Sequence, residues 1–264
     1  MQVIRKAHKS MKNENDNSKT ANKKQGRHSI ADLHNAIDTN MRIKIIENGP
    51  YHVTGSIPIR EMIITQQGNH NILTEGRKLP QAQEYFLCRC GESHNAPFCD
   101  GSHVSAHFNG AETASRAPYT ERIVDVVEGT TMKLLDDDRC AFARFCHAKQ
   151  GDVWSMTERD DDPEIRESVI KAVCECPSGR LVLVDNDGYI LEDINEPEIL
   201  IVQDPAQNSS ASIHVKGPII IEAADGTEYE VRNRVALCRC GKSRNKPFCD
   251  ASHVKFSFDD GYLK

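Results

Sequence analysis

The string CRCGESHNAPFCDGSH at residues 88–103 returns almost unchanged as CRCGKSRNKPFCDASH at residues 238–253. Each copy follows the spacing C-x-C-x8-C-x3-H, so three cysteines and one histidine recur in the same order. Thiolates and imidazoles are common ligands of zinc and of iron in proteins. The repeated string therefore predicts two metal sites in one chain.

The spacing within each copy sets what the backbone has to do. Cysteines two apart point to opposite faces of an extended segment, so the chain must curl before both can reach one group. Gly91 and Gly241 follow the cysteine pairs and permit that curl. The later cysteine and the histidine are four apart, which would place them on one face of a helix that Asp100 or Asp250 caps. The candidate ligands are Cys88, Cys90, Cys99 and His103 in the first copy, and Cys238, Cys240, Cys249 and His253 in the second.

Three thiolates and one imidazole suit either zinc or an iron–sulfur cluster. Zinc sites usually have two to four residues between paired cysteines, so C-x-C is a poor match. A binuclear cluster has two irons, and it can divide a close cysteine pair and a Cys/His pair between them. The pattern favours iron and leaves a zinc-stapled turn as the alternative.

Both strings resemble the CDGSH iron–sulfur domain, whose best-known members are mitoNEET-like proteins. The resemblance implies a 2Fe–2S cluster in each copy, with the C-x-C pair on the inner iron and the Cys/His pair on the outer, solvent-facing iron. Ala251 stands where the family motif has glycine. Because alanine is small and a good helix former, we expect the local geometry to survive this change.

The repeat extends upstream of the cysteines. YHVTGSIPI (51–59) precedes the first string and IHVKGPIII (213–221) precedes the second, and both are rich in β-forming residues. Typical CDGSH proteins are homodimers that share a β-rich cap, with one cluster in each chain. By this resemblance, two units in one chain would form an internal pseudo-dimer, and we expect a monomer.

Four more cysteines lie between the two copies, in the order Cys140, Cys146, Cys174 and Cys176. Bacterial ferredoxins use C-x2-C-x2-C with a remote Cys-Pro. On that pattern Cys140 and Cys146 take the first and third positions, Ala143 takes the middle position, and Cys176 is the cysteine before proline.

This middle segment resembles the divergent, single-cluster ferredoxin-like modules found beside CDGSH domains. The resemblance implies a 3Fe–4S or 4Fe–4S cluster on Cys140, Cys146 and Cys176, with Cys174 or His147 as the candidate for a fourth ligand. The alternative is that these cysteines are inert core residues, because cysteine is among the most buried residue types.

Composition predicts small modules rather than one large core, because aromatic residues make up 6% of the chain and charged residues 27%. We expect an α+β protein that is mostly β, with two CDGSH modules flanking a ferredoxin-like insert. A helix should begin at Pro163 behind an Asp162 cap and end at Pro177, and a second should follow a Ser29 cap. The expected ranges are a disordered polar tail at 1–40, the first repeat at 41–110, the middle segment at 119–192 and the second repeat at 198–264.

The same sequence argues against several classes of protein. A net charge of −6 disfavours a nucleic-acid binder that neutralises phosphates, and no apolar run is long enough to span a membrane. The N-terminus lacks a signal- or transit-peptide pattern, so we expect the protein in the cytoplasm. In that reducing compartment, clustered cysteines are more often metal ligands or redox groups than disulfides. There is no nucleophile elbow, P-loop or dinucleotide fingerprint, and we do not expect an enzyme.

The expected function is electron transfer to a redox partner protein. A neutral imidazole ligand raises the reduction potential of a cluster, and it can be protonated near physiological pH. Acid should loosen it from iron, so delivery of an intact cluster to an apo-acceptor protein is the second hypothesis. A zinc-stapled interaction module is the third.

Overall fold

The computed structural model describes residues 26–263, and most of the expected polar tail lies outside the described residues. Where the description begins, the helix expected after Ser29 is present as α1 (Ile30–Asn35). The Ser29 side chain accepts a hydrogen bond from the Asp32 N–H, and Leu33 is buried. No helix within the described residues is long and apolar enough to cross a bilayer.

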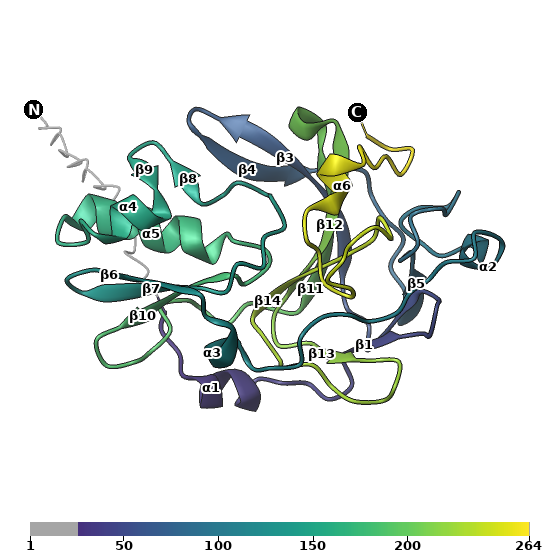
Figure 1. Cartoon of the computed structure of the whole chain (residues 1–264), viewed down its shortest axis with the longest axis horizontal. Helices are drawn as coiled ribbons and strands as arrows, with labels where there is room; N and C mark the ends of the chain where they lie inside the picture. The colour runs from purple at the N-terminus through teal and green to yellow at the C-terminus, as the bar shows by residue number, and fades with distance from the viewer. Residues whose placement is uncertain (1–25, 264) are drawn as a thin grey trace, which may run out of the picture.

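Two β-sheets carry the repeated parts of the chain (Figure 1). One is five-stranded and has the order β14 (Arg234–Leu237), β12 (Ser209–Lys216), β11 (Glu198–Asp204), β3 (Ile59–Gln67) and β4 (His70–Glu75). The other is four-stranded and has the order β13 (Ile220–Glu222), β1 (Arg42–Ile45), β2 (Tyr51–Thr54) and β5 (Glu84–Leu87).

The two repeats exchange one strand each. In the first repeat β1, β2 and β5 form an antiparallel group, and in the second repeat β11, β12 and β14 form the matching group. The remaining strand crosses over: β3 runs parallel to β11, with Ile59 paired to Ile199, and β13 runs parallel to β1, with Ile220 paired to Arg42. Sequence reasoning found the β-rich segments but did not anticipate this exchange.

The exchange gives the repeats one shared hydrophobic core. Side chains from both sheets meet in it, including Ile43 and Tyr51 of the first repeat and Ile199, Ile213 and Leu237 of the second. All five are almost completely buried. Because burial of apolar area is the main stabilising term, neither repeat can separate without exposing this core.

The middle segment lies to one side of the two sheets (Figure 1). Its three-stranded sheet has the order β10 (Leu181–Asp185), β7 (Met132–Asp136) and β6 (Asp125–Glu128), beside the short hairpin β8 (His147–Ala148) and β9 (Gly151–Asp152). Two helices, α4 (Val153–Thr157) and α5 (Pro163–Cys174), pack on it through a core that includes Met132, Leu134, Val169, Ile170 and Leu181.

Helix α5 confirms the expected start and corrects the expected end. Asp162 accepts hydrogen bonds from the Glu164 and Ile165 N–H groups, and Pro163 is the first helical residue. The helix stops at Cys174, before Pro177, because a residue that precedes proline avoids the helical conformation and the last turn must loosen earlier. The short remaining elements are α2 (Ser102–Ser105), α3 (Tyr119–Arg122), the 3-10 turn η1 (Pro205–Gln207) and α6 (Ser252–Lys255).

The middle segment is fastened to the second repeat by the loop that carries its first two cysteines. Ala143 and Phe145 pack against Leu200 of β11. Arg144 forms a two-pronged ion pair with Asp204, at 2.7 and 3.0 Å. This loop therefore covers one face of the five-stranded sheet.

Candidate metal centres

The candidate ligands of each repeat come together as two pairs. In the first repeat the Cys88 and Cys90 sulfurs lie 3.6 Å apart, and the Cys99 sulfur lies 3.4 Å from Nδ1 of His103. The second repeat reproduces both distances, 3.6 Å between Cys238 and Cys240 and 3.4 Å between Cys249 and His253. Within residues 26–263, no group of three or more His, Cys, Asp or Glu side chains is arranged to hold a single metal ion.

Backbone hydrogen bonds fold each cysteine loop against the end of its strand. The Cys88 N–H donates to the Pro97 carbonyl at 2.8 Å, and the Cys99 N–H donates to the Phe86 carbonyl at 2.9 Å. The Ser93 hydroxyl closes the loop from inside by donating to the Phe98 carbonyl at 2.6 Å. The second repeat makes the same three bonds, from Cys238 to Pro247, from Cys249 to Ala236 and from Ser243 to Phe248.

The expected helix that joins the last cysteine to the histidine is wrong. Helix α2 begins only at Ser102, so Cys99 precedes it and only His103 is helical. Gly101 precedes the helix with φ +91°, which turns the chain so that the histidine ring reaches back to the sulfur. Asp100 does accept from the Ser102 N–H, at 3.0 Å, as a cap would.

The reason given for tolerating Ala251 is also wrong, although the geometry survives. Ala251 takes the place of Gly101 and has the left-handed conformation, with φ +65°. Helix propensity is irrelevant there, because an L-residue with a Cβ is strained at positive φ. The second repeat therefore holds the same turn at the cost of local strain.

Hydrogen bonding activates one thiol of each close pair. The pKa of Cys88 is lowered to about 6, first by the hydrogen bond from Cys90 and then by the Gly91 N–H, against the effect of burial. The pKa of Cys238 is lowered to about 7 for the same reasons. A thiol that ionises readily is suited to bind metal, because the thiolate is the ligand.

In the middle segment Cys146 lies close enough to Cys140 and Cys176 for their charges to act on its thiol. Burial raises the pKa of the Cys146 thiol to about 11, and the neighbouring Cys176 and Cys140 add to the rise. The Cys140 sulfur accepts from the Phe142 N–H at 3.3 Å, and the Cys176 sulfur lies 3.5 Å from the Ser178 hydroxyl.

The two candidates for a fourth ligand differ in their surroundings. The Cys174 thiol donates to the Leu191 carbonyl at 3.5 Å, and burial raises its pKa to about 12, with Glu192 adding to the rise. His147 is exposed in the hairpin, opposite Asp152.

Two protein-family models match parts of this chain. The model described as "Iron-binding zinc finger CDGSH type" matches residues 48–104 and 210–254, and the one described as "Divergent 4Fe-4S mono-cluster" matches residues 127–186. The chain carries two CDGSH repeats around a divergent 4Fe–4S segment. It is an iron–sulfur-binding protein. No curated protein and no solved structure matched it.

The two CDGSH repeats touch each other at their cysteine loops. A Cβ added at Gly91 would lie 2.7 Å from the Cys240 carbonyl oxygen, and one added at Gly241 would collide with the Cys90 carbonyl oxygen. Tyr51 of the first repeat also reaches across, and its hydroxyl donates to the Cys238 carbonyl at 2.8 Å. The two candidate centres are therefore neighbours in one structure.

The divergent 4Fe–4S segment is in turn a neighbour of the second CDGSH repeat. Cys140 and Cys249 line the same open cavity, of about 700 Å³. Ala141, next to Cys140, packs directly with Cys249 and Ala236. The three candidate centres thus follow one another, with the second CDGSH repeat in the middle.

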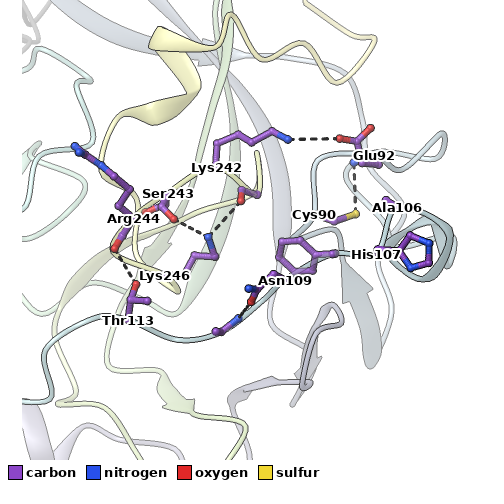
Figure 2. Close-up of a pocket in the computed structure, with 13 residues that line it drawn as sticks. Cys90, Glu92, Ala106, His107, Asn109, Thr113, Lys242, Ser243, Arg244 and Lys246 are labelled. Atoms are coloured by element: carbon purple, nitrogen blue, oxygen red, sulfur yellow. Dashed lines mark hydrogen bonds and ion pairs between the residues drawn. The ribbon is translucent and has the colours of Figure 1, made fainter.

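A pocket of about 560 Å³ is lined by residues of both CDGSH loops, as Figure 2 shows. Cys90 lines it on one side and the basic residues Lys242, Arg244 and Lys246 on the other. Lys246 donates to the Ser243 carbonyl at 2.7 Å and so stiffens its own loop. Lys242 lies 4.0 Å from Glu92 across the pocket.

Sequence reasoning missed the arginine that lies between the paired cysteines of each repeat. Arg239 is buried, forms an ion pair with Asp260 and donates to the Ala211 and Val202 carbonyls. Arg89 is buried as deeply, but it donates to three backbone carbonyls, those of Gly49, Gly110 and Ile46. The only sequence feature that could have revealed these arginines is their recurrence in C-R-C at 88–90 and 238–240, which suggests a common structural role.

Proposed function

We propose that each CDGSH repeat binds one 2Fe–2S cluster and that the middle segment binds one 3Fe–4S or 4Fe–4S cluster. The ligands would be Cys88, Cys90, Cys99 and His103 in the first repeat, Cys238, Cys240, Cys249 and His253 in the second, and Cys140, Cys146 and Cys176 in the middle.

The pairing of the ligands supports this assignment. A mononuclear zinc site needs four ligands around one point, whereas a binuclear cluster needs one pair for each iron. Two pairs at 3.6 and 3.4 Å, in both repeats, suit the second arrangement. For the middle segment, three neighbouring cysteines suit a larger cluster whose corners are farther apart.

Such clusters would supply one-electron chemistry, and we propose electron transfer to a redox partner protein as the function. The observation that carries this proposal is the succession of neighbouring centres: Cys140 and Cys249 share a cavity, and the loops of Cys90 and Cys240 are in contact. The role of the chain's own residues is to hold the three centres near one another and to shield the Cys249 and His253 side chains of the second repeat from water.

Delivery of a cluster to an apo-acceptor protein remains a second candidate, favoured by one observation. His103 and Cys99 are partly exposed, whereas His253 and Cys249 are each 2% exposed. A partner could reach the first repeat's Cys/His pair without opening the fold.

We further propose that the two repeats form an internal pseudo-dimer and that the protein is a monomer. The reciprocal exchange of β3 and β13 supports this, since each sheet is completed within one chain. Light scattering on purified protein tests it, and a stable dimer would contradict it.

The test of the proposed function is an anaerobic purification followed by iron, sulfide and zinc analysis of one sample. Coloured protein with matching sulfide, and with more iron than two binuclear clusters contain, is the expected result. Colourless protein that contains zinc and no sulfide would support the zinc-stapled module instead. In the coloured protein His103→Cys and His253→Cys should each lower a reduction potential, because thiolate replaces a neutral ligand.

A further inference from the structure

Three buried polar atoms lack a hydrogen-bond partner within the described part of the chain. They are Gln203 Oε1, Ser212 Oγ and His214 Nε2. All three belong to β11 and β12, the strands that lie under the second repeat's cysteine loop and α6. A buried polar atom without a partner costs about 1 to 3 kcal/mol, so a cluster of them calls for a reason.

Ser212 lies beside two candidate ligands of the second repeat, Cys238 and Cys249. In the β12–β14 ladder Ile213 pairs with Leu237, and one further step in the same register puts Ser212 opposite Cys238. The Ser212 hydroxyl also faces Cys249, whose pKa is raised by burial and lowered in part by this hydroxyl. Ser212 is 2% exposed, so its hydroxyl is buried beside these residues.

The first repeat provides a natural comparison. In its β2–β5 ladder Tyr51 pairs with Leu87, so one further step puts Pro50 opposite Cys88. Proline has no side-chain donor, so the first repeat lacks a hydroxyl at this position. The two repeats thus have the same ligands but differ in this group.

We propose that the Ser212 hydroxyl donates a hydrogen bond to a sulfur atom of the second repeat's cluster site and raises that cluster's reduction potential. This inference rests on the proposed function, since it requires a cluster in the second repeat. A donor to sulfur stabilises the more negative, reduced state, and hydrogen bonds to the sulfurs are an established control of cluster potential. Ser212 is therefore a positioning residue that acts through the sulfur.

The test measures the potential of the second cluster alone. Cys99→Ala removes a ligand of the first repeat and leaves one binuclear cluster, whose potential is followed by redox titration with electron paramagnetic resonance. Adding Ser212→Ala should reduce the equilibrium constant for reduction about tenfold, which corresponds to about 59 mV for one electron. Iron and sulfide content is measured on every sample.

Two further variants keep the test decisive if Ser212→Ala fails to retain its cluster. Ser212→Thr and Ser212→Val have nearly the same volume, but only threonine keeps a hydroxyl, so the valine variant should have the lower potential. In the complementary Cys249→Ala background, Pro50→Ser adds a donor beside Cys88 and should raise the first cluster's potential relative to Pro50→Ala.

The outcomes separate this inference from the proposed function. Equal potentials for Ser212→Thr and Ser212→Val, with iron retained, would overturn the role of Ser212 and leave the clusters in place. Absence of iron and sulfide from the otherwise unaltered protein would overturn the proposed function itself.

Discussion

The first and second CDGSH repeats have the same ligand spacing and the same distances within each ligand pair, yet they lie in different surroundings. The second repeat's Cys249 and His253 are covered by β12 and by the loop of the middle segment, whereas His103 of the first repeat is partly exposed. Arg239 is neutralised by Asp260, whereas Arg89 donates to backbone carbonyl groups and, within the described residues, forms no ion pair. A metal-binding motif specifies the ligands, and the elements packed around it specify how far solvent and charge act on them.

The largest loss of unfolding free energy is expected from removing the Asp260 carboxylate, which pairs with Arg239 and has no counterpart among the partners of Arg89 in the described part of the chain. Asp260→Asn leaves the buried Arg239 without a negative partner and should cost about 3 to 5 kcal/mol of unfolding free energy. Burial tends to raise the pKa of Asp260, but Arg239 lowers it below its ordinary value of 3.8 overall. The ion pair's contribution is therefore present above about pH 4 and is lost as the pH falls further.

Urea denaturation of the apo-protein at neutral pH measures this cost, with the exposed neighbour Asp259→Asn as the control. An equal effect of the two substitutions would mean that the second repeat tolerates an uncompensated arginine as the first repeat does.

The second-largest loss of unfolding free energy is expected from crowding the contact between the two cysteine loops. Gly91→Ala places a Cβ 2.7 Å from the Cys240 carbonyl at a residue with φ +84°, so clash and backbone strain add to about 2 to 4 kcal/mol. Gly68→Ala is the matched control, because Gly68 has φ +61° but nothing within 4 Å. Thermal unfolding of both variants separates strain from collision. If both lost the same stability, the loops would not be in close contact.

Exposure of the Cys/His pair should decide which of the two proposed binuclear clusters loses iron first. Of the two proposed binuclear clusters, Cys249→Ala should retain only that of the first repeat, and Cys99→Ala only that of the second. Iron should leave the first repeat about tenfold faster, since the buried pair of the second requires local opening before a chelator can reach it. Loss of visible absorption in the presence of bipyridyl gives both rates. Equal rates would show that iron loss does not depend on access to this pair.

The smallest change in unfolding free energy is expected at the residues that precede α2 and α6, Gly101 and Ala251. Ala251→Gly should stabilise the protein by about 1 kcal/mol, because alanine is strained at φ +65°. Gly101→Ala should destabilise it by a similar amount, since the added Cβ has open space around it and only the backbone is strained. Chemical denaturation of the two variants should give shifts of opposite sign. Shifts of the same sign would contradict the equivalence of the two turns.

Local features were predictable where neighbouring residues decide them. Asp162 and Pro163 marked the start of α5, and Ser29 marked the start of α1, because capping involves groups within one turn. The helix expected at Cys99 failed for a local reason as well. Glycine in the left-handed conformation at position 101 ends the preceding loop and delays the helix.

The sequence by itself determined the candidate ligands, their spacing and the number of cysteine groups, since these are properties of neighbouring residues. Tertiary structure alone decided the exchange of β3 and β13, the burial of His253 and the orientation of Ser212 toward Cys249. Each of these depends on pairing between residues that lie far apart in the chain. Such pairing depends on the total apolar area that the folded chain buries. That area depends on the whole fold, so it cannot be read from any single stretch of sequence.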